Sequence, residues 1–379
     1  MRWSEAALVG CNLVVFAGCA LSHDVGGSAA VSAPIELSRA CLDEVEEATD
    51  QLPKHLDCTG LYQDADTLEV ADSLEVFAPA YPLWTDAAQK HRWIFVPEGE
   101  QIDASDPNAW KFPNGTRLWK EFSSPDGTRK IETRMLMKSE EGDWSYTTYL
   151  WDDAGKRATR FDQGKELTVD GKTYALPSHS QCNECHVGRR ERVLGFDAVS
   201  LGLTSMDQDG QSTHDSQSGM TLDQLVSEER LKNFDGSTQY QLGPEPEGAE
   251  ARALGWMHNN CGVSCHNTNP NSKAYSSGLR LNLDPTQLDG RETDDFIAIQ
   301  TTIGQEVFAL QWQGQKRIEP GKPEESLLYK LITSRGDPKQ QMPPLGTNYT
   351  DDENIRFVKE WITGMAAPEA GSGASAQPE

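Results

Sequence analysis

The stretch Cys182-Asn183-Glu184-Cys185-His186 lies where the chain changes character. Before it, residues 76–176 hold short runs of β-branched and aromatic side chains, such as 130–138 and 144–151, separated by turn signals such as Asn114-Gly115. Five or more short strands at this spacing predict an antiparallel β sandwich or barrel. After the stretch, helix signals dominate, so the sequence as a whole predicts a multidomain β + α fold.

The helices are predicted from their start signals and their apolar periodicity. Thr221 begins one helix, residues 249–259 form a second, and Pro323 occupies the first position of a third. The stretch Thr350-Asp351-Asp352-Glu353 has the pattern of a capping box and precedes apolar residues at helical spacing, which predicts a last helix.

The charge of the chain limits its partners. It carries 59 acidic and 34 basic residues, for a formal net charge of −25. This excess of carboxylates argues against a nucleic-acid partner, because a phosphate backbone requires clustered Lys and Arg. It favours a cationic partner, or it serves only to keep the surface soluble.

The N-terminus indicates export. Residues 8–20 form a short apolar run that suits the core of a signal peptide at 1–22 and is too short to span a bilayer. We therefore expect a periplasmic or cell-envelope location, and Cys19 sits in a lipoprotein-like cleavage site that would anchor the chain to a membrane. Export also favours a disulfide between Cys41 and Cys58, which lie outside every motif.

The first cysteine motif has the spacing of a covalent haem attachment site. A c-type haem needs two thiols that reach its vinyl groups and an imidazole that reaches its iron, and two residues between the cysteines with His directly after meet this need. Cys182 and Cys185 would form thioethers, and His186 would be the proximal iron ligand. A zinc half-site and a disulfide are the alternatives, and export makes zinc the less favourable of the two.

A second motif, Cys261-Gly262-Val263-Ser264-Cys265-His266, has three residues between its cysteines. The extra residue must bulge out if Cys261 and Cys265 both form thioethers, and a disulfide between them is the alternative. His266 is the candidate proximal ligand. Further along, Met342 precedes two prolines in a loop, which favours a distal iron ligand over a gap-filling core side chain.

Several stretches resemble a known family. Residues 318–329, Met342-Pro343-Pro344 and Trp361-Ile362 resemble the planctomycete-type cytochrome c module. The longer chain resembles secreted bacterial proteins that place such a module after a β-rich domain, on the stretches 81–86, 110–116, 132–136, 149–151, 176–178 and 194–196. The resemblance covers about residues 60–365 and implies a C-terminal all-α cytochrome c-like domain. Some relatives are joined to quinoprotein sugar-dehydrogenase domains, which implies an electron-accepting role; the relatives mostly have the shorter spacing at the second motif.

These features divide the chain into five predicted segments. They are a signal peptide at 1–22, a linker at 23–38, a β-rich domain at 39–242 that ends in the first motif and a helix, a cytochrome c-like domain at 243–366, and a disordered tail at 367–379. The Gly- and Pro-rich run at 243–248 marks the boundary between the two domains.

We therefore expect an exported di-haem c-type cytochrome that takes electrons from an exported redox protein or a quinoprotein dehydrogenase domain and passes them on. We assign it no catalytic residue. Two alternatives stay open: a peroxidase- or oxidase-type haem enzyme with an open first haem, and a surface-binding lipoprotein whose Cys-His motifs hold disulfides or metal. The first haem has no evident distal ligand, and the candidates are His179, Met206, His214, Met220, Met257 and His258.

Overall fold

The computed structural model describes residues 39–47, 50, 52–203 and 219–365. The predicted signal peptide, linker and tail lie outside the described residues, as do Cys19 and the ligand candidates Met206 and His214. All the described residues belong to one compact unit, Pro34–Glu379. None of the helices within the described ranges combines the length and the apolar character that crossing a membrane requires.

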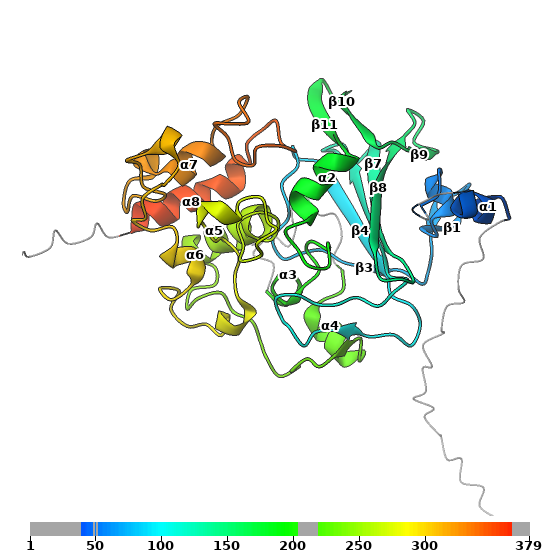
Figure 1. Cartoon of the computed structure of the whole chain (residues 1–379), viewed down its shortest axis with the longest axis horizontal. Coiled ribbons are helices and arrows are strands. Elements are labelled where there is room, and N and C mark those ends of the chain that lie inside the picture. Colours follow the sequence, from blue (N-terminus) through cyan, green and yellow to red (C-terminus); the bar gives the residue numbers. More distant parts are fainter. Residues whose placement is uncertain (1–38, 48–49, 51, 204–218, 366–379) are drawn as a thin grey trace, which may run out of the picture. The chain divides into compact units, whose positions relative to one another are not determined.

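A six-stranded antiparallel sheet forms the largest element of the fold (Figure 1). Its strands pair with their neighbours in chain order, and β7 and β8 coincide with the runs predicted at 130–138 and 144–151. The antiparallel, β-rich part of the prediction is therefore confirmed. The strands are β3 (Glu75–Val76), β4 (Gln89–Phe95), β6 (Arg117–Ser123), β7 (Lys130–Lys138), β8 (Trp144–Trp151) and β9 (Ala158–Arg160).

The predicted closure into a sandwich or barrel is wrong. The sheet is open, with β3 and β9 at its edges, and the other strands of the described chain form only two-stranded sheets. The faces of the sheet are covered by loops and helices, so the sheet does not need a second sheet to bury its side chains. The two-stranded sheets are β1 (Tyr62–Asp64) with β2 (Glu69–Val70), β10 (Gln163–Val169) with β11 (Lys172–Ser178), and β5 (Ile102–Asp103) with β12 (Leu231–Lys232).

The two faces of the sheet differ because successive side chains of a strand point to opposite sides. On one face, Trp93, Trp119 and Met135 are neighbours across β4, β6 and β7 and pack with the buried leucines of residues 52–61. On the other face, Ile94, Leu118 and Leu136 form a row that packs with a second core. The sheet is therefore buried on both sides.

Helices account for most of the remaining regular structure. The α-helices are α1 (Arg39–Glu47), α2 (His179–His186), α3 (Ala198–Gly202), α4 (Leu222–Ser227), α5 (Ala249–Met257), α6 (Ile297–Gln300), α7 (Leu327–Ile332) and α8 (Asp352–Gly364). A π-helix covers His258–Gly262, and 3-10 turns cover Leu56–Cys58, Tyr275–Ser277, Pro285–Gln287, Leu310–Trp312 and Pro323–Glu325.

The predicted start signals are mostly confirmed. Thr221 caps α4, and Pro323 opens a 3-10 turn before α7. The predicted capping box at the last helix is wrong by one residue, because the side chain of Asp351 accepts the backbone N–H of Asn354 and α8 begins at Asp352. The predicted disulfide Cys41–Cys58 is confirmed and ties α1 to the turn at Leu56–Cys58.

The β-rich and helical parts share a core. Beyond residue 243 the described chain forms helices joined by long loops, and α5 packs against α8. Tyr81, which precedes β4, is buried in that core, and its ring lies so close to Gly255 of α5 that a Cβ at this position would be 2.1 Å from the ring. Glycine at residue 255 therefore permits the helix to pack on a residue of the β-rich part.

Candidate functional site

Both cysteine motifs open onto one cavity. Its wall includes Cys182, Cys185 and His186 of α2, the matching residues Cys261, Cys265 and His266 of the second motif, and the loop of Met342. The sequence predicts that these residues belong to two separate domains. In the structure all seven predicted site residues line the same cavity wall. The rest of the wall is largely apolar, with leucines at 83, 118, 136, 194 and 345.

The first motif is carried by a regular helix that begins where β11 ends. The side chain of Ser178 accepts the backbone N–H of Gln181, and the side chain of Gln181 bonds back to the backbone of Ser178 in a capping box. On an α-helix, residues three and four apart share a face. Cys182, Cys185 and His186 therefore present two thiols and one imidazole to the same side of α2.

His186 has the surroundings of a metal-ligating histidine. Its Nδ1 lies 2.5 Å from the backbone carbonyl oxygen of Arg192, so the N–H at Nδ1 donates to that oxygen and the lone pair is left on Nε2. Burial lowers the pKa of His186 to about 4, which keeps the ring neutral. The ring of Tyr146 stacks beside it, with centroids 6.3 Å apart. A neutral imidazole oriented by a backbone carbonyl is the form that binds iron.

The second motif absorbs its extra residue by local π-helical winding. The backbone N–H of Val263 donates to the carbonyl of His258 at 2.8 Å, and that of His266 donates to the carbonyl of Cys261 at 2.8 Å, both five residues apart. An inserted residue in a helix is usually accommodated in this way, often at functional sites. Winding of this kind keeps Cys261, Cys265 and His266 on the cavity wall despite the longer spacing.

His266 is buried and neutral. Burial lowers the pKa of its ring to about 4. Its Nδ1 makes no hydrogen bond, although the backbone of Leu279 lies beside the ring. A metal-ligating histidine usually donates its other ring N–H to a carbonyl or a carboxylate. His266 therefore lacks the orienting partner that His186 has in the carbonyl of Arg192.

The two motifs touch each other. The Sγ of Cys265 lies 3.9 Å from the backbone carbonyl oxygen of Glu184, next to Cys185, and the interaction of the two thiols raises the pKa of Cys185 and lowers the pKa of Cys265 to about 7. Lys273 pairs with Glu184 at 2.7 Å, beside the two thiols. A Cβ at Gly188 would lie 1.8 Å from the backbone oxygen of Ser264, so the backbone after α2 is in direct contact with the second motif. The two attachment sites are therefore adjacent.

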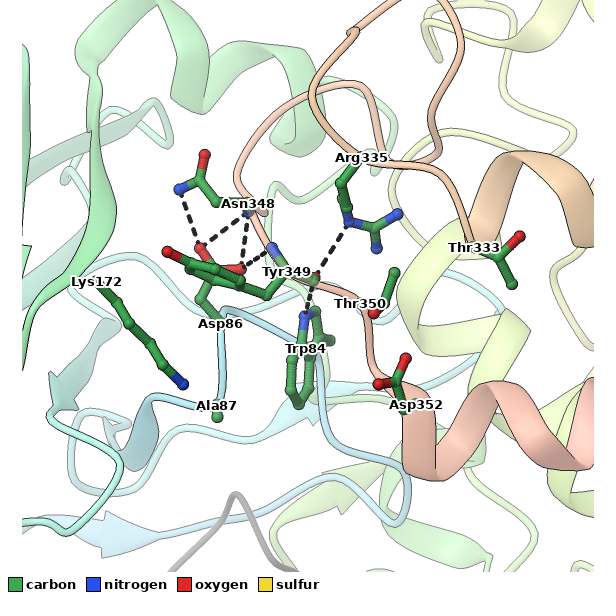
Figure 2. Close-up of a pocket in the computed structure, with 10 residues that line it drawn as sticks. All are labelled: Trp84, Asp86, Ala87, Lys172, Thr333, Arg335, Asn348, Tyr349, Thr350 and Asp352. Atoms are coloured by element: carbon green, nitrogen blue, oxygen red, sulfur yellow. Dashed lines mark hydrogen bonds between the residues drawn. The ribbon is translucent and has the colours of Figure 1, made fainter.

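The loop of Met342 is held from the β-rich part of the chain. Figure 2 shows the carboxylate of Asp86 facing Asn348 and Tyr349, whose backbone N–H groups donate to it at 2.8 and 2.9 Å. The indole N–H of Trp84 and the guanidinium of Arg335 both donate to the carbonyl of Tyr349. The residues after Met342 are thus fixed by three hydrogen bonds to Trp84 and Asp86 of the β-rich part and by one to Arg335 of the same loop.

The same segment, residues 81–86, also holds the second motif. The backbone N–H of Trp84 donates to the side-chain oxygen of Asn260 at 2.8 Å, and Asn260 donates back to the carbonyl of Pro82 at 3.1 Å. We call residues 81–86 the clamp. In the sequence the clamp is one of the stretches that carry the family resemblance, but a run of aromatic and polar residues in a loop does not indicate which residues it contacts.

The candidates for a distal ligand of the first haem do not reach the cavity. Of those within the described residues, Met220 and Met257 are buried in the apolar cores, and His258 accepts the backbone N–H of Leu283. His179 stacks on Tyr146 from the same helix as His186. None of the four belongs to the cavity wall. The second site has a distal candidate on the wall in Met342, and the first does not.

The residues fit a covalently attached haem better than a metal ion held by protein side chains alone. Among the described residues, no three His, Cys, Asp or Glu side chains converge as ligands of one ion. A haem iron needs only one or two protein ligands, and the cavity supplies two thiol pairs, two neutral imidazoles and a thioether within apolar walls. Comparisons of the chain with family models, curated proteins and solved structures return no match.

Proposed function

We propose that this protein is an exported c-type cytochrome that binds two haem groups and carries electrons from an exported dehydrogenase to a downstream acceptor. The observation that supports it most strongly is the convergence of two Cys-Cys-His sets and Met342 on one largely apolar cavity. Bound haem would supply an iron centre that takes up and releases one electron at a time.

The residues of the chain have distinct tasks in this proposal. Cys182 and Cys185 hold the first haem and Cys261 and Cys265 the second. His186 and His266 supply neutral imidazole ligands, and Met342 supplies a thioether, a ligand that favours ferrous iron and raises the potential. The apolar wall excludes water and keeps the site at low dielectric. The C-terminal part, from residue 243, is proposed to be the cytochrome c-like module of the protein.

The contact between the motifs supports electron exchange within the molecule. The Sγ of Cys265 lies 3.9 Å from the backbone of Glu184, next to Cys185, so two haems attached at Cys185 and Cys265 would have adjacent attachment points. An electron that enters at one site could then reach the other without a second protein. We propose that the protein acts as a two-centre relay.

The test is the intact mass of the protein and its redox spectrum, after export in a host that matures c-type cytochromes. We expect the mass of two haems and a sharp α-band on reduction. Contact between Cys185 and Cys265 also permits a disulfide in an oxidising compartment. A protein without haem whose mass has fallen by two hydrogens for each further disulfide would overturn the proposal.

A haem enzyme with an open first site is the second candidate. It is favoured by the absence, among the described residues of the cavity wall, of the distal ligands proposed from sequence for the first haem. The ferric spectrum separates the two candidates: an open site gives a high-spin signal and binds carbon monoxide when reduced, whereas a pure carrier is low-spin at both haems.

A further inference from the structure

The loop between α6 and α7 ends in apolar side chains that are open to solvent. Phe308 and Leu310 each have an exposed fraction of 86%, whereas no other large apolar side chain of the described residues exceeds 41%. Trp312 beside them is half-buried. Single exposed apolar residues need no explanation, but neighbouring ones on one loop mark an interaction surface. We call residues 307–315 the tip.

The tip is held by a hydrogen-bonded stem. Glu306 and Lys316 face each other in an antiparallel bridge, and the backbone N–H of Val307 donates to the carbonyl of Gln315 at 3.0 Å. The stem is tied to the rest of the chain by Arg317, whose guanidinium donates to the carbonyls of Ser277, Gly278 and Thr301. The exposed side chains are therefore presented from a fixed base.

The tip can enter an apolar layer without burying a charge. It contains no charged residue, although charged residues make up 25% of the chain. Within the tip, the backbone N–H of Trp312 donates to the carbonyl of Ala309 at 2.9 Å, and that of Gln315 donates to the carbonyl of Trp312 at 3.1 Å. These N–H groups would stay paired when water is removed, which lowers the cost of insertion.

The position and charge of the chain argue against a protein as the occupant of the tip. None of residues 307–315, all of which the structure describes, lines the cavity of the two cysteine motifs. A redox partner would have to approach that cavity and not the tip. A second copy would bring another formal charge of −25 toward the first, and like charges oppose association.

We infer that the tip inserts into the surface of a lipid bilayer, with Phe308 and Leu310 entering the apolar boundary and Trp312 lying at the level of the headgroups. Indole rings are enriched at this level because they are amphipathic. A lipid at Cys19, as the sequence predicts, would be joined to Arg39 by residues 20–38, which reach at most about 70 Å when extended. The inference does not depend on the haem assignment.

The contact is apolar and not electrostatic. Lys316, at the end of the tip, is paired with Glu319 at 2.8 Å, and the chain as a whole is strongly acidic. Anionic headgroups repel such a chain, and salt screens this repulsion. We therefore expect stronger binding to vesicles of phosphatidylcholine than to vesicles of phosphatidylglycerol at low salt.

The test measures flotation of the processed protein with phosphatidylcholine vesicles. The protein is exported with a signal peptide that directs no lipidation, so that an attached lipid does not hide binding by the tip. We expect the wild type to float, and Phe308→Gln with Leu310→Gln to lower the partition coefficient at least about tenfold, because two apolar side chains are lost from the contact. Leu42→Gln, at an exposed leucine of α1, is the matched control and should bind like the wild type.

Three outcomes would overturn the inference. The first is a wild type that does not float, or a double variant that floats like Leu42→Gln; both substituted side chains are exposed, so the variant should unfold at the same midpoint as the wild type. The second is stronger binding to phosphatidylglycerol that falls with added salt, which would assign binding to basic side chains. The third is a dimer in sedimentation that the double variant lacks, which would make a second copy the occupant.

Discussion

The two cysteine motifs reach the same cavity by different local structures. At the first, a capping box at Ser178 and Gln181 starts a regular α-helix that sets two thiols and an imidazole on one face. At the second, π-helical winding over His258–Gly262 takes up one more residue and still brings the matching groups to the wall. The spacing of the cysteines along the sequence therefore predicts the site less well than the helical winding of the backbone at each motif.

The two sites also differ in what surrounds them. The second has Met342 on the wall and the clamp at 81–86 to hold the loop of Met342. The first has on its wall, among the described residues, none of the distal ligands proposed from sequence. Under the proposed function the two haems would therefore differ in potential, because a thioether ligand, which raises the potential, is available at the second site alone.

Removal of the thiols at one motif should have the largest effect. Cys182→Ser with Cys185→Ser should lose the mass of one haem, because no thiol remains at that site to form a thioether. Cys261→Ser with Cys265→Ser should lose the other, and intact mass measures both. If either double variant loses both haems, the two sites depend on each other during attachment and the comparison between them fails.

Single variants at the second motif refine this result. Cys261 lies five residues before His266, one more than in the regular motif, whereas Cys265 precedes His266 directly, so Cys265→Ser should reduce haem attachment more than Cys261→Ser. The intact masses of the two variants decide the order. Equal loss in both would indicate that the π-helical winding makes the two thiols equivalent.

The next largest effect is expected at Met342. Met342→Leu keeps an apolar side chain of similar size but removes the thioether, so the potential of one haem should fall while both haems stay attached. A spectroelectrochemical titration measures the two potentials. Met220→Leu, in the core behind the sheet, is the matched control and should change neither. If Met342→Leu also leaves both potentials unchanged, Met342 is not a ligand.

Much of the fold could be predicted from the sequence, because the signals are local. Alternating and β-branched runs located β7 and β8 at their exact bounds, and start signals located α4 and the turn at Pro323. The disulfide Cys41–Cys58 followed from export and elimination. Whether the sheet closes into a sandwich or barrel or stays open could not be predicted, because this depends on which other elements cover the two faces of the sheet.

The site could be predicted by its residues but not by its assembly. Each motif indicates its own chemistry, but the contact of Cys265 with the backbone of Glu184 joins segments far apart in the chain, and no local pattern predicts it. The basic residues of the cavity wall have the same origin, because Arg92, Lys120 and Arg134 become neighbours only through the register of three strands. The clamp likewise depends on the tertiary structure, because it requires the Asp86 carboxylate to lie next to the backbone N–H of Asn348.

An acid-dependent loss of stability is expected beside the second site. Burial lowers the pKa of His258, at the start of the π-helix, to about 4 from its ordinary 6.5, with opposing influences from Asp197 and Arg189. The unfolded chain therefore binds the proton first, so stability present above pH 6.5 is lost as the pH falls toward 4, by at most about 3 kcal/mol. His186 and His266 would not contribute once they ligate iron.

Chemical unfolding at several pH values tests this expectation. His258→Asn retains an acceptor for the backbone N–H of Leu283 but cannot be protonated, so its stability should fall less than that of the wild type between neutral and acidic pH. His179→Asn, at an exposed position beside the first motif, should behave like the wild type. The same acid dependence in His258→Asn and wild type would contradict the assignment.

The smallest effect is expected at the clamp, where it shows how far the second site depends on the β-rich part. Asp86→Ala removes the acceptor of the Asn348 and Tyr349 backbone N–H groups, which should cost about 1–2 kcal/mol of unfolding free energy and loosen the loop of Met342. We expect a weaker charge-transfer band of the Met-ligated ferric haem, with no change at the first haem.

Asp126→Ala, in an exposed turn with similar hydrogen bonds, is the control. A fully retained band in a destabilised Asp86→Ala protein would mean that the helical part positions Met342 unaided, and that the clamp only joins the two parts of the chain.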